Sequence, residues 1–279
     1  MITLSNGYSF EYMAASGALA DGWGWFWDHP FRWFGLLDLR DFVIVAKTVT
    51  RWPRVGNFRW YWPWGSVRPL RGGMLNSFGL RNGGIDQWCC EVGPRVKQGD
   101  IRLVASIHGS APELTEMTQM LNAFDLVGVE VNASCPNVGH IQSTKEAVEA
   151  CLVVKAHSRH PVGLKLSVVH DVEAILPRIE GRAEWISINS VPWSIAFRDK
   201  ASPLEHLGGG GVSGKLAQPH NWRLVERLVA AGTVPVVGPS VWSFDDIAQL
   251  RKLGARAIGF GAIFRYPWKP TAYIRRDRR

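Results

Sequence analysis

The stretch "VGVEVNASCPNVGH", residues 127–140, decides how the rest of the chain is interpreted. Val127, Val129 and Val131 alternate in the manner of a β-strand, and the apolar run stops at a polar cluster that begins with Asn132. Cys135 stands just past this predicted strand end. A thiol on a loop can act as a general base or nucleophile, whereas most free cysteines are buried and inert, so position alone leaves both roles open.

Strand-like runs of this kind recur along the whole chain. Several are almost continuously apolar, which is typical of strands buried on both faces of a parallel sheet. Helix-like patterns at 111–124, 144–158 and 220–232 alternate with them. This order predicts an α/β fold, a (β/α)8 TIM barrel, with residues 1–279 as a single domain. The eight runs are residues 10–15, 43–49, 102–107, 126–134, 162–167, 184–190, 234–240 and 257–262.

The alternation of strands and helices is weaker in several segments. Trp-rich insertions occupy 21–34 and 57–65, where aromatic residues alternate with Arg, Gly and Pro instead of following a helical period. A long Pro/Gly-rich loop is expected from about 50 to 84, and the run after the eighth strand is expected to be too short for a full final helix. Four tryptophans of the first insertion are predicted to pack over the barrel mouth or to contact a membrane surface. They are Trp23, Trp25, Trp27 and Trp33.

Composition limits the class of protein. With 279 residues, 46% hydrophobic and 20% charged, the chain can bury a large core. Its net charge of +8 favours anionic partners such as phosphate, nucleic acid or acidic lipid, although a basic surface is often only a solvated face. No membrane-spanning run or signal pattern is found, so a cytoplasmic protein is expected, with peripheral membrane contact left open. Four cysteines without CxxC spacing, and no HExxH, argue against a metal site.

Polar and small residues gather at the ends of the predicted strands, where a barrel of this type forms its active site. Lys47 and Lys165 interrupt apolar strands, so each needs a partner, a ligand or a route for its ammonium to the rim. Asparagines at strand ends are often only turn formers, but several around one pocket suit a flat ligand with alternating carbonyl and N–H groups. The glycine-rich run 207–216 can cradle a phosphate or serve as a loop, and Leu216 excludes a nucleotide-triphosphatase motif.

Together these motifs resemble the dihydroorotate dehydrogenases, FMN-dependent oxidoreductases of pyrimidine biosynthesis built on a (β/α)8 barrel. The resemblance covers about residues 8–265 and is carried by "NASCPN", with "MAASG", "AKTVT", "LNSFGLRNGG", "LKLS", "INS", "GGVSG" and "GFGA" in the family's order. Cysteine at the fourth position of "NASCPN" is similar to the soluble class; the membrane-bound class has serine there. The resemblance implies a flavoprotein that oxidises a CH–CH bond, converting dihydroorotate to orotate.

The same resemblance implies a role for each matching residue. Cys135 would be the general base that removes a proton from C5, while a hydride passes from C6 to FMN. The substrate-binding residues would be Lys47, Asn76, Phe78, Gly79, Leu80, Asn132, Asn137, Asn189 and Ser190. The FMN-binding residues would be Ala15, Ser16, Gly17, Lys47, Thr48, Asn132, Lys165, Gly214, Gly238, Gly261 and Ala262.

Some features depart from the family and leave alternatives open. The family usually has a Gly-Gly pair after the seventh strand, whereas this chain has Gly238, Pro239 and Ser240, and proline has no N–H to donate. A related FMN barrel acting on another pyrimidine, either a free base or RNA dihydrouridine, and a divergent non-catalytic interaction barrel are the competing hypotheses. Fumarate, a nicotinamide reached through a partner subunit, and quinone stay open as acceptors, and a homodimer is expected from the soluble class.

Overall fold

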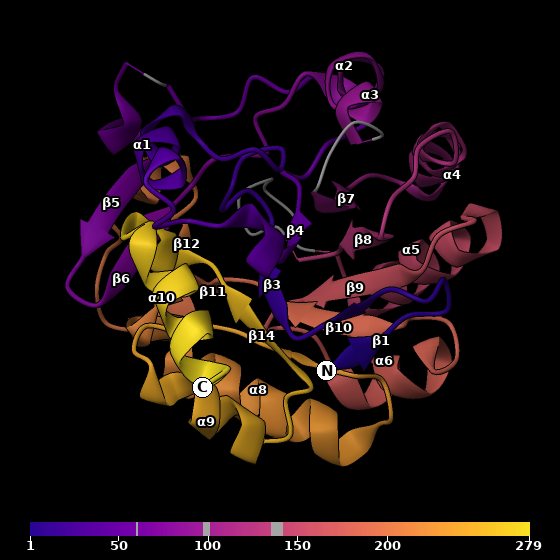
Figure 1. Cartoon of the computed structure of the whole chain (residues 1–279). Helices are drawn as coiled ribbons and strands as arrows, with labels where there is room; N and C mark the ends of the chain where they lie inside the picture. The colour runs from indigo at the N-terminus through magenta and orange to yellow at the C-terminus, as the bar shows by residue number, and fades with distance from the viewer. Residues whose placement is uncertain (60, 97–100, 135–141) are drawn as a thin grey trace.

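The computed structural model describes residues 1–59, 61–96, 101–134 and 142–279, and Figure 1 shows strands surrounded by helices. Each of the eight predicted runs contains a strand of one parallel sheet, which confirms the predicted barrel. The runs are apolar enough to be buried on both faces, and only a helix-covered sheet offers that environment. The strands are β3 (Tyr12–Ala14), β4 (Val43–Val45), β7 (Arg102–Ile107), β8 (Gly128–Asn132), β9 (Val162–Leu166), β10 (Trp185–Ile188), β13 (Val237–Gly238) and β14 (Ala257–Phe260).

The sheet closes on itself in chain order. β3 pairs with β4 on one side and with β14 on the other, and every pairing in this sheet is parallel. The gap between β10 and β13 is closed by a parallel bridge between Ile186 and Val236. All strand carboxyl ends therefore meet at one rim, the barrel mouth, where an active site is expected.

Helices form the outer shell, and the three predicted helical patterns correspond to α4, α5 and α8. Capping boxes begin two of them, with Ser110 and Glu113 at α4 and Ser143 and Glu146 at α5. The α-helices are α1 (His29–Trp33), α2 (Gly84–Glu91), α3 (Gly93–Val96), α4 (Ala111–Leu121), α5 (Thr144–His157), α6 (Val172–Ile179), α7 (Trp193–Ala196), α8 (Gln218–Ala231), α9 (Asp245–Lys252) and α10 (Trp268–Asp277). The 3-10 helices are η1 (Phe26–Asp28), η2 (Leu39–Asp41), η3 (Pro63–Gly65), η4 (Glu205–Leu207), η5 (Lys215–Ala217) and η6 (Ala262–Arg265). Among the described residues no helix is long and apolar enough to cross a membrane.

The floor of the barrel is an apolar plug centred on Trp185, whose side chain is fully buried. A Cβ built on Gly163 would stand 2.0 Å from Trp185 Cε2, and one on Gly128 would stand 2.7 Å from Cη2. Only glycine leaves room for the indole ring at these two places. An N-terminal hairpin, β1 (Ile2–Thr3) and β2 (Ser9–Phe10), covers this end of the barrel.

The expectation of one long loop from about 50 to 84 is wrong, because part of this segment belongs to a second sheet. That segment carries an antiparallel hairpin, β5 (Val67–Leu70) and β6 (Gly73–Asn76), and the chain turns between them at Gly72, which has a φ of +88°. β6 also pairs with β12 (Gly211–Gly214), which in turn pairs with β11 (Val191–Pro192). The glycine-rich run predicted as a loop or phosphate cradle thus supplies a strand that holds segments far apart in the sequence together.

The expectation of an incomplete final helix is wrong, because α10 has ten residues. Its polar sequence is held by tertiary contacts. Asp277 binds Arg251 at 2.6 Å and the Tyr12 hydroxyl at 2.5 Å, and Arg278 binds Asp41 at 2.9 Å. These contacts attach α10 to α9 and to the start of β3.

Candidate active site at the barrel mouth

Thr48 is the centre of a hydrogen-bonded layer at the barrel mouth. Its hydroxyl lies 3.1 Å from Ser16 Oγ and 2.8 Å from Ser106 Oγ, and it accepts a hydrogen bond of 3.0 Å from Asn132 Nδ2. These four residues come from the ends of β3, β4, β7 and β8. Three of them were predicted site residues, so the structure brings together groups that lie more than a hundred positions apart in the sequence.

The layer continues across the mouth from β8 to β10. Asn132 Oδ1 accepts from the Ser134 backbone N–H at 3.3 Å and from its hydroxyl at 3.1 Å, and the Ser134 carbonyl accepts from Asn189 Nδ2 at 2.9 Å. Asn189 Oδ1 accepts from the Ser190 backbone N–H at 2.8 Å, and its carbonyl accepts from Asn221 Nδ2 at 3.1 Å. Buried and half-buried amides bonded in this way are fixed in orientation because each partner is also fixed.

Lys165 of β9 pairs in register with Asn132 and projects into the barrel. Its ammonium lies 3.4 Å from Glu130 Oε1, and both side chains are almost completely buried. Glu130 also accepts hydrogen bonds from Ser187 Oγ at 2.6 Å and from Ser106 Oγ at 3.3 Å. The buried lysine therefore has the partner that its sequence context demanded. Two positions further along the chain, just past the end of β9, the Ser167 hydroxyl is buried and has no hydrogen-bond partner among the described residues.

Lys47 lies at another point of the rim, beside Gly17. A Cβ on Gly17 would stand 3.7 Å from Lys47 Cγ, and the Lys47 backbone N–H donates to Ala20 O. Burial lowers the pKa of Lys47, as does the nearby charge of Arg81, although the carboxylate of Asp21 opposes both. Burial likewise raises the pKa of Asp21, and the charge of Lys47 counteracts part of that shift. The site thus holds a partly desolvated cation that can accept an anionic ligand.

The predicted substrate segment 76–80 runs along the second sheet and into a strained turn. Asn76 Nδ2 donates to Gly211 O at 3.4 Å, and the Phe78 ring stacks on Phe58 with centroids 4.8 Å apart. Gly79 and Leu80 both have left-handed backbone, with φ of +66° and +52°. Leucine rarely adopts this conformation, and such strain concentrates at functional sites.

The tryptophans of the first insertion divide between the mouth and the surface. The Trp25 indole N–H donates to Gly17 O at 3.2 Å, and its ring lies against Phe58 with centroids 6.1 Å apart. Trp27 stacks on Trp25, while Trp33 is 78% exposed. The predicted packing of these tryptophans over the barrel mouth is therefore confirmed for Trp25. The predicted contact with a membrane surface stays a prediction.

Three glycines predicted to bind FMN, Gly214, Gly238 and Gly261, lie in two different places. Gly214 and Gly261 belong to segments in contact, since β12 packs against η6, which begins at Ala262. A Cβ on Gly214 would stand 2.8 Å from Gly73 Cα, so no residue larger than glycine fits at this position. Gly238 faces the helical shell, where a Cβ would stand 2.9 Å from the Ala255 Cβ. Ala15 is bonded through its N–H to Phe260 O and lies 3.6 Å from the place of a Cβ on Gly261.

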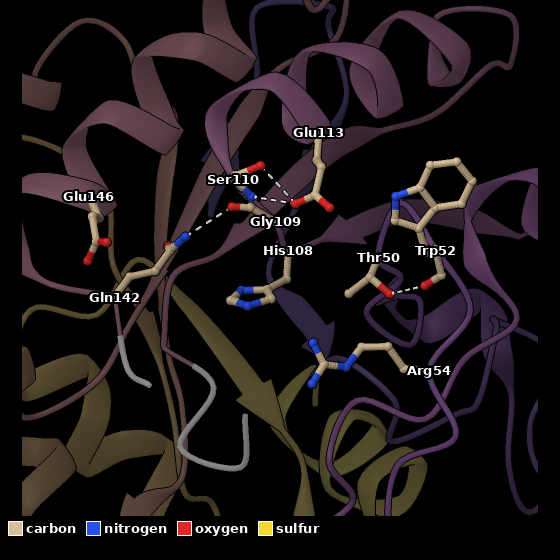
Figure 2. A pocket seen from close by; sticks show the side chains of 9 residues that line it. All are labelled: Thr50, Trp52, Arg54, His108, Gly109, Ser110, Glu113, Gln142 and Glu146. Atoms are coloured by element: carbon tan, nitrogen blue, oxygen red, sulfur yellow. Dashed lines mark hydrogen bonds between the residues drawn. The ribbon is translucent and has the colours of Figure 1, made fainter. Parts of the chain in front are cut away.

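A cavity of about 350 Å³ lies beside this layer and joins it through His108. The His108 Nδ1 atom lies 2.8 Å from Asn132 O, and burial lowers the pKa of His108 below its usual 6.5. Figure 2 shows Arg54 pointing toward the imidazole, and Gln142 donating to Gly109 O at 3.1 Å. The lining residues are Thr50, Trp52, Arg54, His108, Gly109, Ser110, Glu113, Gln142 and Glu146.

Two predicted site residues, Cys135 and Asn137, lie outside the described residues. The structure therefore describes the approach to "SCPN" as far as Ser134, whose side chain is buried and bonded to Asn132. Within 1–59, 61–96, 101–134 and 142–279, no group of three or more His, Cys, Asp or Glu side chains could hold a metal ion.

Several polar residues of the site were not among the predicted ones, including Ser106 and Ser134 of the hydrogen-bonded layer. Glu130 and Ser187 sit inside strands that look apolar, and Asn221 lies on a helix, where it also donates to Ser240 Oγ at 3.0 Å. Asp21 lies within a Trp-rich insertion. The alternation of side chains along a strand could have identified Glu130, because it is two residues before Asn132 and therefore faces the same side of the sheet.

The family model and the curated relatives that match this chain carry the same family name. A family model described as dihydroorotate dehydrogenase matches residues 34–271. Curated relatives named "Dihydroorotate dehydrogenase B (NAD(+)), catalytic subunit" are similar to most of the chain. That of Geobacillus kaustophilus (strain HTA426) is 31% identical over 232 residues, covering 78% of this chain and 72% of the relative. That of Bacteroides thetaiotaomicron is 29% identical over 229 residues, covering 78% and 74%, and that of Halalkalibacterium halodurans is 31% identical over 240 residues, covering 81% and 77%.

Proposed function

The chain belongs to the dihydroorotate dehydrogenase family, and from this premise we propose that it oxidises dihydroorotate to orotate with FMN as hydride acceptor. The observation that carries the proposal is the layer at the barrel mouth, where Thr48, Asn132 and Lys165 lie within one connected set of hydrogen bonds. Family membership alone would leave the site unspecified. This layer supplies the fixed donors and the cation that a flavin and an acidic pyrimidine both need.

The residues at the mouth fit FMN. The Ser167 hydroxyl and Asn221 Oδ1 are buried without a hydrogen-bond partner among the described residues, which favours a polar ligand in their neighbourhood. Lys165 and Thr48 would hold the polar edge of the isoalloxazine ring. Gly214, with Gly261 and the following 3-10 helix, would hold the phosphate by backbone N–H groups. When bound, FMN supplies the acceptor for the hydride.

The substrate would bind beside this FMN site. Lys47 would bind the carboxylate, and Asn76, Asn132 and Asn189 would bind the amide edge of the ring. Cys135 would take the proton that leaves C5 of dihydroorotate. A hydride leaves C6 at the same time, and the bond between C5 and C6 becomes double. The fixed asparagines hold the ring so that both departures occur from defined positions.

The names of the relatives support a proposal about the electron acceptor. They are called NAD(+) enzymes and catalytic subunits, so we infer that this chain passes electrons to a nicotinamide through a partner subunit. A homodimer of catalytic chains is part of the same proposal. Residues 1–279 would act as one domain, and the insertions 21–34 and 57–65 would be its distinctive surface features.

One surface favours an additional contact with lipid. The aromatic turn, residues 26–36, exposes large apolar side chains: Phe26, Trp27, Trp33, Phe34 and Leu36. Arg275 of the basic C-terminal helix donates to Gly35 O at 3.0 Å, so cationic groups border this turn. Figure 1 shows α1 and α10 on the same side of the molecule, and Phe31 packs on Trp268 with centroids 5.5 Å apart. Aromatic side chains flanked by cations suit an anionic lipid surface.

Flotation with phosphatidylcholine vesicles, with and without phosphatidylserine, tests this contact. The chain is expected to float only with the anionic vesicles, and Trp33→Ser with Phe34→Ser is expected to abolish flotation. Val229→Ser, which changes an exposed apolar side chain of α8, is the matched control and should still float. No flotation of the unaltered chain, or concentration-dependent self-association through the turn instead, would contradict the lipid proposal.

Turnover tests the enzymatic proposal. The FMN-loaded chain should form orotate from dihydroorotate with a dye as electron acceptor. Cys135→Ala should abolish turnover with FMN still bound, and Cys135→Ser should turn over slowly with a higher pH optimum, because a hydroxyl titrates far above a thiol. Lys155→Met, which removes a lysine of the helical shell, is the control for loss of a cation and should stay active. Activity with dihydrouracil or dihydrouridine RNA, but not with dihydroorotate, would favour the alternative pyrimidine reductase.

A further inference from the structure

Glu130 is a buried carboxylate at the centre of the barrel, with 1% of its surface exposed. It pairs in register with Ser106 of β7 and with Gly163 of β9. Lys165 pairs with Asn132 and therefore lies one level nearer the mouth. Glu130 thus stands between the apolar floor and the layer proposed to hold FMN.

Three strands supply partners to this one carboxylate. Ser187 of β10 donates to Oε2 at 2.6 Å, Ser106 of β7 donates to Oε1 at 3.3 Å, and Lys165 of β9 lies 3.4 Å from Oε1. A long, flexible lysine side chain would otherwise have many rotamers open to it. The carboxylate and its two hydroxyl donors form a rigid base against which the ammonium is held.

Stability alone gives a weak reason for this arrangement. Taking two charges out of water costs several kcal/mol per ion, and replacing a buried ion pair with apolar residues is often neutral or stabilising. The barrel floor directly below is filled by apolar side chains around Trp185. A buried pair next to a proposed cofactor site is therefore better explained by its effect on Lys165 than by folding.

We propose that Glu130 is a positioning residue that holds the Lys165 ammonium down toward the barrel floor, limits its approach to FMN, and so sets the reduction potential of the flavin. The inference rests on the proposed function, because it requires FMN in the barrel mouth. FMN takes up two electrons and one proton on reduction and then carries an additional negative charge on its ring. A nearby ammonium stabilises that charge, and a nearby carboxylate weakens this stabilisation.

The test is the midpoint potential of bound FMN in Glu130→Gln, measured anaerobically with xanthine and xanthine oxidase as the electron source and a reference dye. Glutamine keeps the shape of the side chain and can still bind both serine hydroxyls, but it carries no charge. The equilibrium constant for two-electron reduction is expected to rise at least about tenfold, which is an upward shift of about 30 mV. Should the glutamine variant not fold, Glu130→Asp keeps the charge at a greater distance from the ammonium and should give a smaller rise.

Lys165→Met distinguishes an effect through the lysine from a direct effect of Glu130 on the flavin. In the Lys165→Met background, Glu130→Gln is expected to change the potential by less than about twofold in equilibrium constant. An equal rise in both backgrounds would overturn the positioning role. Glu184→Gln is the matched control, since Glu184 pairs with Lys155 at 3.3 Å outside the barrel and should leave the potential unchanged.

Two failures can be told apart. A wild-type chain that takes up no FMN would overturn the proposed function, and this inference with it. FMN-loaded variants with potentials equal to that of the wild type would overturn the role of Glu130 alone.

Discussion

Gly163→Ala tests the physical basis of the barrel floor. The added methyl would stand 2.0 Å from Trp185 Cε2, 2.3 Å from Cζ2 and 2.4 Å from Nε1. The indole is fully buried, and Phe10 meets it edge to face with centroids 6.5 Å apart, so the ring has no free space to enter. Overpacking a core lowers the free energy of unfolding by about 1–3 kcal/mol and occasionally more. Because three ring atoms would be too close to the new methyl, the expected loss for Gly163→Ala is roughly 3 kcal/mol. Urea unfolding of the FMN-free chain, followed by circular dichroism, measures the loss.

A double-mutant cycle with Trp185→Leu isolates the contact. Leucine lacks the three ring atoms that meet the new methyl, so the cost of Gly163→Ala should fall by about 2 kcal/mol in that background. Gly128→Ala is the comparison, because its methyl would meet Pro161 O at 2.9 Å as well as the ring, and relief should be only partial. A coupling energy below about 0.5 kcal/mol for Gly163 and Trp185 would refute the argument.

Three further predictions concern the site and its supports. Burial lowers the pKa of Lys47, so orotate affinity should fall as pH rises through that lowered pKa. The fall should be roughly tenfold or more, because a hydrogen bond to a charged group contributes about 1.5–3 kcal/mol, and Lys47→Arg should remove it in orotate titrations. Burial, with the hydrogen bond to Asp277, raises the pKa of Tyr12 to about 12, so the contribution of Tyr12 to the free energy of unfolding is complete below pH 10.0 and is lost as pH rises through about 12. The free energy of unfolding of Tyr12→Phe should not show this decline. Ser240 has a φ of +68° and accepts a hydrogen bond from Asn221. Ser240→Ala and Ser240→Gly both lose this bond, but only alanine keeps the backbone strain, so Ser240→Ala should unfold about 1 kcal/mol more easily than Ser240→Gly. Equal stability of those two variants would contradict the strain at this turn.

The barrel itself could be predicted from the sequence because its strands carry their own signal. Runs such as 102–107 and 162–167 are apolar enough to require burial on both faces, and their number and their alternation with helices point to one topology. The rim residues followed from the same reasoning, since the end of each strand marks the mouth. This is why Thr48, Asn132 and Asn189 were found before their contacts were known.

The second sheet could not be predicted in the same way. β5 has the sequence VRPL, and its partner β6 is four residues long, so neither has a strong strand pattern. β6 also pairs with β12, which is more than a hundred residues away. Pairing across that distance depends on where the barrel brings the two segments, which local sequence does not encode.

Glu130 and α10 were missed for related reasons. A single acidic residue in "VGVEV" resembles an exposed strand position, and its three partners lie on other strands. The helix α10 has the polar sequence WKPTAYIRRD, and its attachment depends on Arg251 and Asp41 elsewhere in the chain. In both cases the decisive interactions are tertiary ion pairs and hydrogen bonds, which leave no periodic pattern.

The visible absorption spectrum of the purified chain, before and after anaerobic addition of dihydroorotate, tests the central claim most directly. The account predicts a flavin spectrum that bleaches when dihydroorotate is added, because the hydride from C6 reduces the bound FMN. A flavin spectrum that stays unchanged would contradict dihydroorotate as the substrate, and a colourless chain that takes up no added FMN would contradict the flavin site itself.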